Sequence, residues 1–467
     1  MTLNAAIARF ATLFAIAYLL LGARQVWLQV VAGPAIAADR HNPRLALLAR
    51  FRGAIVARDG TLLAVSTPKG RSYPLGASLA HAVGYASATY GTSGLEAAFD
   101  ADLSPRLVAN DPVRQFRSLF GRGETDADQR GATVVTTIDP RVQSALYQGL
   151  SAFPRAAGIA LDPRTGEVLA IASVPSFDPA TIDRSFSTLA RDPRSPLLDR
   201  ALDGLYPPGS TFKIFTAAAA LDAGAVTPDS TFEDTGGYQI GSFVVHDDES
   251  EATGEQDLAG AFALSSNVDF AQIALKLGAH RWFEYAGRWG FGRPLEFTLP
   301  AAVDHLPTRE SVTPSILAQL GFGQADLLVT PLRMALIGAT IASGGNEPRP
   351  YLVRAVRWND GRQTPDASAG SLATPIASET ASEVRDLMVA CVESGTGTPA
   401  ALPGVTVAGK TGTATNPAGR SHAWFVAFAP ADAPRVAVAV VVENVGYGAT
   451  YAAPIARRVL AAGLGPT

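Results

Sequence analysis

The chain has very few of the residues that build covalent crosslinks and metal sites. Of its 467 residues only Cys391 is a cysteine, so no intramolecular disulfide can form in any compartment. Cys391 lies in the apolar run 387–392, and we expect it to be a small residue of the core. The six histidines show no HExxH or other spacing typical of metal ligands. We therefore predict no metal and no other cofactor.

The chain also carries little excess charge of either sign. The net charge is −4 and no basic stretch is present, which argues against a nucleic-acid partner. The one acidic run, residues 247–251, is interpreted as a solvated loop. A hydrophobic content of 47% without a long polar tract indicates a folded protein, and the length exceeds that of one ordinary domain.

No uninterrupted apolar run reaches the roughly 20 residues that a membrane-spanning helix needs. Residues 10–31 are nevertheless mostly apolar, with Arg24 able to snorkel to an interface that Trp27 also marks. We predict that residues 10–31 form a single membrane anchor behind a cytoplasmic tail of residues 1–9. A cleaved signal peptide is the alternative, because residues 35–37 have the A-x-A form.

Lysine is the scarcest basic residue of this chain. Among 38 lysines and arginines only four are lysines, and two of these four lie in short strings of chemically active residues. Arginine cannot lose its proton in a protein, whereas a desolvated lysine can lose it and act as a base. The strings, in chain order, are Ser210-Thr211-Phe212-Lys213, Ser265-Ser266-Asn267 and Lys410-Thr411-Gly412-Thr413.

The first string predicts an activated hydroxyl nucleophile. Residues 207–209 (Pro-Pro-Gly) cannot continue a helix backward, so a helix should begin at Ser210, with the hydroxyl at the positive end of its dipole. Lys213 follows one turn later on the same face, where a neutral amine could accept the proton of the serine. The alternative interpretation is a capping serine beside a snorkelling lysine.

The second string predicts a proton relay next to an amide. We expect Ser265 to pass a proton to a leaving amine, and Asn267 to hold Lys213 and the amide of a substrate. The alternative is a plain N-cap turn before the helical run 268–277.

The third string is expected on a strand. Gly412 in the strand interior is typical of a close approach by another backbone or a ligand, and a substrate peptide could pair along this edge. We expect Lys410, as a charged ammonium, and Thr411 to bind a terminal carboxylate. The backbone N–H groups of Thr413 and Ser210 would form an oxyanion hole. The alternative is an edge-strand lysine with a bulge glycine.

Strand and helix signals predict one antiparallel sheet covered by helices, an α/β (α+β) fold. Helical spacing dominates the middle of the chain, residues 200–340. The expected hairpins are 52–65, around Asp59-Gly60, and 158–173; the expected helices are 140–150, capped by Asp139, and 212–223, ended by Gly224; the expected late strands are 405–409, 423–429 and 436–442.

These motifs resemble those of a class B penicillin-binding protein, a monofunctional D,D-transpeptidase of peptidoglycan synthesis. The resemblance extends from Trp27 onward. Its further motifs are Arg52-Gly53-x-Ile55, Gly94-Leu95-Glu96, Tyr206-Pro207-Pro208-Gly209-Ser210, Gly321-Phe322-Gly323-Gln324 with Thr330-Pro331, Gly395-Thr396-Gly397 and His422-Ala423-Trp424-Phe425.

The resemblance implies two extracytoplasmic domains. Residues 32–150 would form a small mixed pedestal (dimerisation-like) domain. Residues 151–467 would form a penicillin-binding/serine β-lactamase-like transpeptidase domain with a five-stranded sheet and an all-helical subdomain. The catalytic residues carried over are Ser210, Lys213, Ser265, Asn267 and Lys410, and the substrate-binding residues are Thr411, Gly412 and Thr413.

The resemblance also implies an activity and partners. Ser210 would be acylated by the penultimate D-alanine of a stem peptide, an amine of a neighbouring stem would resolve the ester into a crosslink, and β-lactams would acylate the same serine. A polytopic glycosyltransferase of the shape, elongation, division and sporulation type would be the membrane partner. A catalytic domain outside the membrane would place the amino terminus in the cytoplasm.

The chain also departs from the usual pattern of the class. A short pedestal and the absence of a carboxy-terminal module are similar to smaller actinobacterial-type members, and they leave a division or an elongation role open. No glutamate-rich glycosyltransferase motif is present. A serine β-lactamase is disfavoured because no Glu-x-x-Leu-Asn-like segment lies between the second and third strings. A D,D-carboxypeptidase and a non-catalytic β-lactam-binding scaffold or sensor remain as alternatives.

Overall fold

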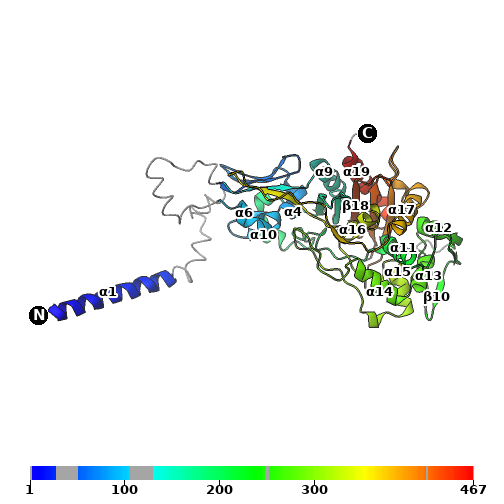
Figure 1. The fold of residues 1–467 in the computed structure, drawn as a ribbon, viewed down its shortest axis with the longest axis horizontal. Helices are drawn as coiled ribbons and strands as arrows, with labels where there is room; N and C mark the ends of the chain where they lie inside the picture. Colours follow the sequence, from blue (N-terminus) through cyan, green and yellow to red (C-terminus); the bar gives the residue numbers. More distant parts are fainter. Residues whose placement is uncertain (1–2, 28–50, 106–129, 248–251, 417–418, 466–467) are drawn as a thin grey trace.

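A computed structural model describes residues 3–27, 51–105, 130–247, 252–416 and 419–465 of the chain. Figure 1 shows the amino-terminal helix, a small mixed region and a larger body that contains the carboxy terminus. The predicted end of the anchor, residues 28–31, and the alternative cleavage site, residues 35–37, lie outside the described residues.

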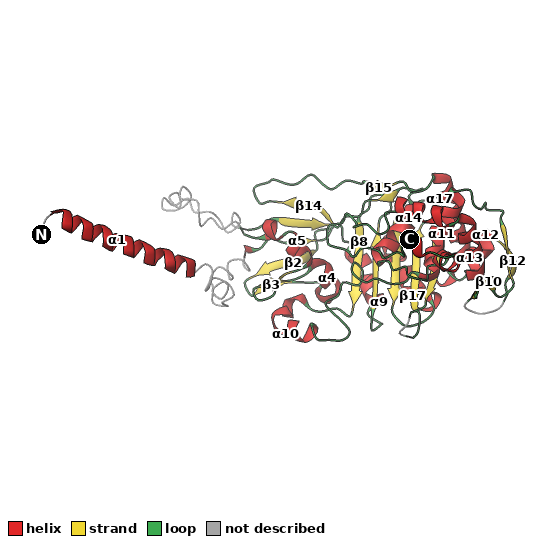
Figure 2. Ribbon diagram, turned by 90° about the horizontal axis from the view of Figure 1, so that it is seen from below, coloured by secondary structure: helices red, strands yellow, loops and turns green. Residues whose placement is uncertain are grey.

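The larger body is built on a five-stranded antiparallel sheet with the strand order β16-β17-β18-β7-β8 (Figure 2). Nearly every residue of these strands is buried, so the strands read as continuous apolar runs without polar alternation. The predicted sheet of two early and three late strands is confirmed. The strands are β7 (Ala156–Leu161), β8 (Val168–Val174), β16 (Ala408–Ala414), β17 (His422–Ala429) and β18 (Val436–Val442).

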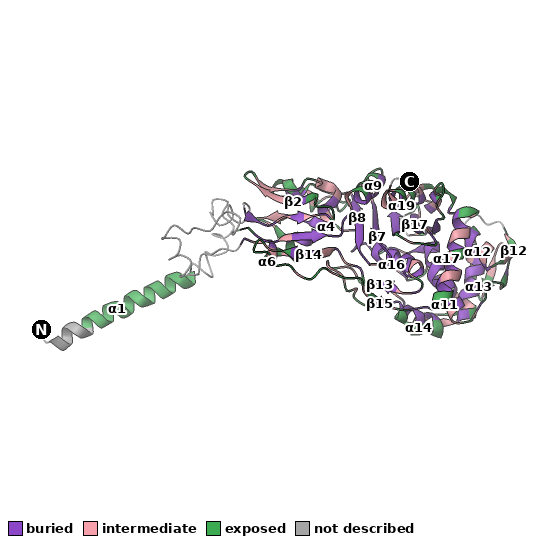
Figure 3. Ribbon diagram, turned by 45° about the horizontal axis from the view of Figure 1, so that its top comes forward, coloured by how far each residue is buried: buried purple, intermediate pink, exposed green. Residues whose placement is uncertain are grey.

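Helices cover both faces of this sheet, as the purple strands between layers in Figure 3 show. Alternate strand residues belong to different cores: Ala156 and Ala160 pack with α9 and α19, whereas Ala157 and Ile159 pack with α11, α16 and α17. Cys391 is buried in the second of these cores, as expected. These helices are α9 (Pro140–Leu150), α11 (Lys213–Asp222), α16 (Pro331–Ala342), α17 (Ser378–Glu393) and α19 (Ala453–Leu464).

The helical subdomain beside the sheet also contains strands that the sequence did not predict. Four short strands form two small antiparallel pairs between residues 231 and 257, so the expectation of a helical middle is wrong there. The first of them alternates exposed and buried residues, which is a period of two. The elements are β9 (Thr231–Asp234), β10 (Tyr238–Ile240), β11 (Phe243–Val245), β12 (Gly254–Asp257), α12 (Leu258–Leu264), α13 (Asn267–Leu277), α14 (Ala279–Arg288) and α15 (Pro314–Gly321).

The small mixed region, called the pedestal below, contains the second five-stranded sheet of the described chain, with the order β14-β6-β1-β2-β3. The predicted hairpin around Asp59-Gly60 is confirmed, with Gly60 at φ +87°. One strand, β14, comes from far along the chain and pairs with β6. The strands are β1 (Ile55–Val56), β2 (Leu62–Thr67), β3 (Gly70–Ser72), β6 (Thr133–Thr136) and β14 (Val353–Arg357).

A buried ion cluster joins the two pedestal motifs of the sequence. Glu96, on α5 (Gly94–Ala98), is fully buried and accepts hydrogen bonds from Arg52 and, at 2.7 Å, from Arg71. Because an unpaired buried carboxylate is strongly destabilising, the glutamate needs these two guanidinium groups.

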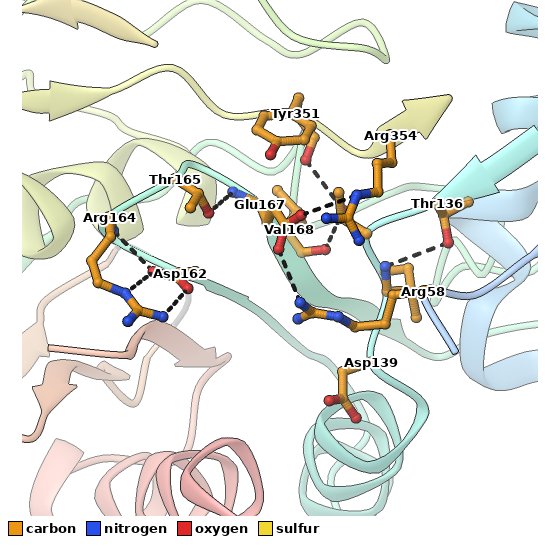
Figure 4. Close-up of polar contacts among 12 residues, drawn as sticks. Arg58, Thr136, Asp139, Asp162, Arg164, Thr165, Glu167, Val168, Tyr351 and Arg354 are labelled. Atoms are coloured by element: carbon orange, nitrogen blue, oxygen red, sulfur yellow. Dashed lines mark hydrogen bonds and ion pairs between the residues drawn. The ribbon is translucent and has the colours of Figure 1, made fainter. Parts of the chain in front are cut away.

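Glu167, in the turn before β8, links the pedestal to the larger body (Figure 4). Its buried carboxylate lies 3.2 Å from Arg58 of the pedestal turn and 4.0 Å from Arg354 of β14. Helix α9, which begins at the predicted Asp139 cap, packs on β8 and α19 although it precedes residue 151. The division at residue 150 therefore stays a prediction.

Helix α1 (Leu3–Val26) lies at the amino terminus. Its residues from Arg9 onward are exposed, as its green colour in Figure 3 shows, and the stretch 9–26 is long and apolar enough to cross a membrane. A helix of this length spans about 36 Å at 1.5 Å per residue, more than the hydrocarbon core of a bilayer. The helix fits the predicted membrane anchor.

Candidate active site

Ser210 lies in a single 3₁₀ turn, Gly209–Phe212, that leads directly into α11. The predicted helix start at Ser210 is a 3₁₀ turn that begins one residue earlier, and the α-helix itself begins at Lys213, three residues later than expected. Gly209 has φ +53° and donates its N–H to the carbonyl oxygen of Gly323 at 2.9 Å. Gly323 has φ +75°, and a Cβ there would lie 2.2 Å from the carbonyl oxygen of Gly209. The turn that carries Ser210 thus depends on two glycines in close contact.

The same turn packs against strand β16 at Gly412. A Cβ on Gly412 would lie 2.9 Å from Cγ2 of Thr211 and 3.1 Å from the carbonyl oxygen of Pro208. The indole Nε1 of Trp424, which is opposite Gly412 on β17, donates to the carbonyl oxygen of Pro207 at 3.0 Å. The interior glycine therefore admits the backbone of the nucleophile turn.

Lys213 is fully buried and points at the second string. Its Nζ donates to Asn267 Oδ1 at 2.9 Å, to Ser265 Oγ at 3.2 Å and to the carbonyl oxygen of Ser265. Ser265 has φ +66°, a left-handed conformation that separates α12 from α13. The N-cap of α13 is Ser266, so the capping alternative applies to the middle residue of the string and not to Ser265.

Lys410 and Thr411 lie on β16, the edge strand of the sheet. Lys410 is fully buried, with its Nζ 3.5 Å from Thr411 Oγ1 and 5.5 Å from the ring centroid of Phe262. Thr411 Oγ1 in turn lies 2.6 Å from Oγ1 of Thr396. Thr396 belongs to the quoted Gly395-Thr396-Gly397 motif, to which sequence reasoning assigned no role.

Two cavities meet at Ser210. One, of about 540 Å³, is lined by Thr396 and Thr411 among others; the second, of about 310 Å³, is lined by Phe322 and Asn267 among others. Ser210 and Thr413 line both. The nucleophile candidate, although only 8% exposed, is thus reachable from two sides.

Tyr206, just before the Pro-Pro-Gly turn, is anchored by a residue that the sequence analysis missed. Its hydroxyl donates to Glu443 at 2.9 Å, and Arg200 donates to the same carboxylate at 2.8 Å. Burial raises the pKa of Tyr206 well above its ordinary value, so the phenol stays protonated. Glu443 lies 237 positions from Tyr206, and no local pattern marks it.

Asp247 corrects one interpretation of the sequence. It was assigned to a solvated acidic run, but its carboxylate accepts the backbone N–H groups of Asn267 and, at 3.3 Å, of Val268. The remainder of that run, residues 248–251, lies outside the described residues. Within the part of the chain that the structure describes, no group of three or more histidine, cysteine, aspartate or glutamate residues could hold a metal ion.

The structure thus brings all three strings together around Ser210 and its two cavities. This arrangement places a hydroxyl, a lysine one turn away, a serine–asparagine pair and a second lysine on an edge strand within one site. Such a set of groups can perform acyl transfer through a serine ester.

Comparison with known proteins gives consistent matches along the chain. Residues 156–461 match the family model of the penicillin binding protein transpeptidase domain, and residues 52–134 match that of the penicillin binding protein A dimerisation domain. The chain is 37% identical to the peptidoglycan D,D-transpeptidase PbpA of Mycolicibacterium smegmatis over 99% of both chains. It is 35% identical to PbpA of Mycobacterium tuberculosis, again over 99% of both chains.

Solved structures agree with these sequence matches. The ceftriaxone acyl-enzyme complex of penicillin-binding protein A from M. tuberculosis superposes with a TM-score of 0.82 at 32% identity, covering 90% of this chain and all of that one. A D,D-transpeptidase domain of a peptidoglycan glycosyltransferase from Eggerthella lenta gives a TM-score of 0.79 at 34% identity, covering 89% and 99% of the two chains.

Proposed function

Because this chain belongs to the family of penicillin-binding protein transpeptidases, we propose that it is a peptidoglycan D,D-transpeptidase that works through an acyl-enzyme on Ser210. The observation that carries the proposal is the position of Lys213. Its Nζ is hydrogen bonded to both Ser265 and Asn267, while its backbone lies one helical turn from Ser210, which lines both cavities.

In the first half-reaction, Lys213 acts as the base. Lys213, once it has given up one proton and with it one of its three donated hydrogen bonds, is a neutral amine that takes the proton of Ser210 as the serine oxygen attacks the carbonyl of the penultimate D-alanine of a stem peptide. Asn267 fixes the amine through its Oδ1, so that the lone pair is directed by the surrounding hydrogen bonds. The backbone N–H groups of Ser210 and Thr413 stabilise the oxyanion, each donor contributing roughly 3–4 kcal/mol in typical sites.

The same step needs a group that protonates the leaving amine and a site for its carboxylate. Ser265, in contact with Lys213, passes the proton to the departing D-alanine. Lys410, held behind Thr411, supplies the positive charge that attracts the terminal carboxylate, and the Thr411 hydroxyl donates to it. Gly412 keeps this stretch of β16 close to the nucleophile turn.

In the second half-reaction an amine of a neighbouring stem peptide attacks the ester. The proton transfers then run in reverse: Ser265 and Lys213 remove the proton of the attacking amine and return it to Ser210 as the ester bond breaks. The product is a crosslink between two stems. A β-lactam acylates the same serine, as the ceftriaxone complex of the M. tuberculosis relative illustrates for that protein.

The remaining features of the proposal concern location and partners. Helix α1 is the anchor of a single-pass membrane protein, with the amino terminus in the cytoplasm and the catalytic domain outside. The chain divides into a pedestal domain of residues 32–150, to whose sheet β14 adds a strand from later in the chain, and a transpeptidase domain of residues 151–467. A membrane glycosyltransferase of the shape, elongation, division and sporulation family supplies the glycan strands whose stems are crosslinked.

The test is covalent labelling of the full-length protein in detergent with a fluorescent penicillin, with Ser210→Ala as the control. A stable adduct on the wild type and none on Ser210→Ala is the expected result. Mass spectrometry of the reaction products, after incubation with a D-alanyl-D-alanine stem peptide and an amine acceptor, distinguishes transpeptidase from carboxypeptidase activity. Crosslinked product supports transpeptidation, whereas release of D-alanine without crosslinking identifies a carboxypeptidase. A folded wild type that takes no label overturns the assignment and favours a scaffold.

A further inference from the structure

The amino-terminal end of α13 is held by a carboxyl group from outside the helix. Asp247 Oδ1 accepts the backbone N–H groups of Asn267 and Val268, two of the donors that a helix leaves without intrahelical partners. The residue before it, His246, accepts the side-chain Nδ2 of Asn267 at 3.2 Å through its carbonyl oxygen. Two adjacent residues of one loop thus fix both the backbone and the amide of Asn267.

Asn267 transmits this position to Lys213. Its amide has one donor side and one acceptor side; the donor side is bound to His246, so the acceptor Oδ1 must face the Nζ of Lys213, at 2.9 Å. A shift of the 246–247 loop would therefore move the Asn267 amide that contacts the lysine.

A second carboxyl lies against the first. The side chain of Asp234, at the end of β9, is fully buried and interacts with that of Asp247. Two interacting carboxyl groups favour a state in which only one of them is ionised, because like charges at close range repel and a carboxylate has no hydrogen to donate.

The surrounding donors locate that proton. Asp234 accepts the N–H of Gly236 at 2.8 Å, and the N–H and hydroxyl of Thr253 at 3.1 and 2.8 Å. Three donors on its two oxygens stabilise the ionised form. Asp247 Oδ2, by contrast, is buried and has no hydrogen-bond partner among the described residues, so nothing there stabilises its ionised form.

We propose that Asp247 is a positioning residue that acts as a neutral acid, donating its proton to ionised Asp234 while it fixes Asn267 and, through it, Lys213. The inference rests on the proposed acylation at Ser210. Asp247 does not touch the reacting atoms; it acts through Asn267. The pair carries one negative charge instead of two, so Asp247 adds no charge that would stabilise the protonated lysine.

The pKa directions agree with this location of the proton. Burial raises the pKa of Asp247, to which the bond with Asp234 also contributes. Burial also disfavours the charge on Asp234, but the hydrogen bonds from Asp247, Gly236 and Thr253 outweigh it, and its pKa is lowered. The other titratable groups facing Asp247 are Lys213 of α11, Asp269 of α13 and its own neighbour His246.

The arrangement makes an asymmetric prediction for two isosteric variants of the full-length protein. In Asp247→Asn the amide nitrogen can donate to Asp234 and the amide oxygen can still accept from α13, so the neutral acid is reproduced. In Asp234→Asn only one acceptor oxygen is left for the N–H of Gly236, the N–H and hydroxyl of Thr253 and the proton of Asp247. The NH₂ group of the new asparagine would face at least one of these donors without being able to accept from it. Asp247→Ala removes the contact altogether.

The measurement is the second-order rate of acylation by a fluorescent penicillin from pH 5 to 9, with thermal unfolding of each variant. We expect Asp247→Asn to keep at least about a third of the wild-type rate, whereas Asp234→Asn and Asp247→Ala lose about tenfold or more, the equivalent of at least one lost hydrogen bond to the site. The acid limb of the profile, which reports protonation of the base, should coincide in Asp247→Asn and wild type.

Three results would overturn the inference. The first is an acylation rate of Asp247→Asn as low as that of Asp247→Ala, and the second is a wild-type rate in Asp247→Ala. The third is a shift of the acid limb of the pH profile to lower pH in Asp247→Asn, because such a shift would mean that a negative charge near Lys213 had been removed. Asp247→Asn can keep the hydrogen bonds of this side chain to α13 and to Asp234, so the variant should fold like the wild type. Its unfolding temperature checks this, and a folded variant with a low acylation rate counts against the inference. Failure of the wild type itself to label would instead refute the proposed function.

Discussion

The indole Nε1 of Trp424 donates a 3.0 Å hydrogen bond to the carbonyl oxygen of Pro207, three residues before Ser210. Trp424 is fully buried on β17, the strand beside the edge strand β16, and its partner lies in the loop that presents the nucleophile. The bond therefore links the rigid sheet to the turn that must hold Ser210 in place.

Trp424→Phe should weaken this link without emptying the core. It leaves the half-buried carbonyl of Pro207 without its donor, which costs about 0.5–1.5 kcal/mol, and we expect the penicillin acylation rate to fall about fivefold. Trp358→Phe, in a half-buried position outside the site, is the control and should leave the rate unchanged. The prediction is wrong if both variants acylate at the wild-type rate.

Replacing the scarce lysines by arginine tests their separate roles. Lys213→Arg should abolish acylation, with a loss of at least about 10³-fold, because arginine keeps its proton and cannot act as the base. Lys410→Arg should retain a measurable fraction, because only the positive charge is required there. Lys276→Arg, whose ammonium lies 4.7 Å from the ring centroid of Phe232 and away from Ser210, is the matched control. Equal losses at Lys213 and Lys410 would contradict the division of roles.

Gly323 and Gly224 form a matched pair for the nucleophile turn. Both have a positive φ, +75° and +62°, but a Cβ at Gly323 would meet the carbonyl oxygen of Gly209 at 2.2 Å, whereas nothing lies within 4 Å at Gly224. Gly224→Ala should cost about 1 kcal/mol in stability and leave acylation unchanged. Gly323→Ala should lower the acylation rate as well. Thermal unfolding and labelling of both variants measure the two effects, and equal rates would show that the close contact is dispensable.

Asp269 should make stability depend on pH. Burial raises its pKa to about 6 in the folded protein, above the roughly 3.9 of an unfolded chain. The stability that it contributes is fully present below pH 4 and is lost as the pH rises through 6, since ionisation is harder in the folded state.

Asp269→Asn removes this titration. Relative to wild type, the variant should therefore gain stability between pH 4 and pH 7.5, by at most about 2–3 kcal/mol. Thermal unfolding at several pH values measures the difference between the two proteins, with the exposed Asp229→Asn as the control. A difference that stays constant over this range would exclude a raised pKa.

The parts of the site that local spacing determines could be predicted from the sequence. Ser210 and Lys213 are one helical turn apart, and the glycine within the third string indicated a close approach on a strand. The contact of Asn267 with Lys213 followed from the chemistry expected of the strings, and the structure places the two side chains in hydrogen-bond contact. The main sheet was predictable because its strands are long and apolar.

The remainder depends on contacts between distant residues. Glu443 reaches Tyr206 across 237 positions, and β14 joins the pedestal sheet from the far part of the chain. Asp247 was misread because a run of acidic residues is ordinarily solvated, whereas its role arises only when the loop folds onto α13. The strands β9 to β12 were missed because they are short and partly polar.

Because two cavities meet at Ser210, inhibitors can contact the protein in two different places, and this determines which compounds a resistance substitution affects. A molecule esterified to this serine has room on two sides, toward the hydroxyl groups of Thr396 and Thr411 in one cavity and toward Phe322 in the other. The two sides have different chemical surroundings, so substituents can be varied on one side with little effect on the other. By the same reasoning, a substitution at a residue that lines one cavity should slow acylation by compounds whose contacts lie in that cavity. The protein should stay sensitive to compounds whose contacts lie in the other cavity.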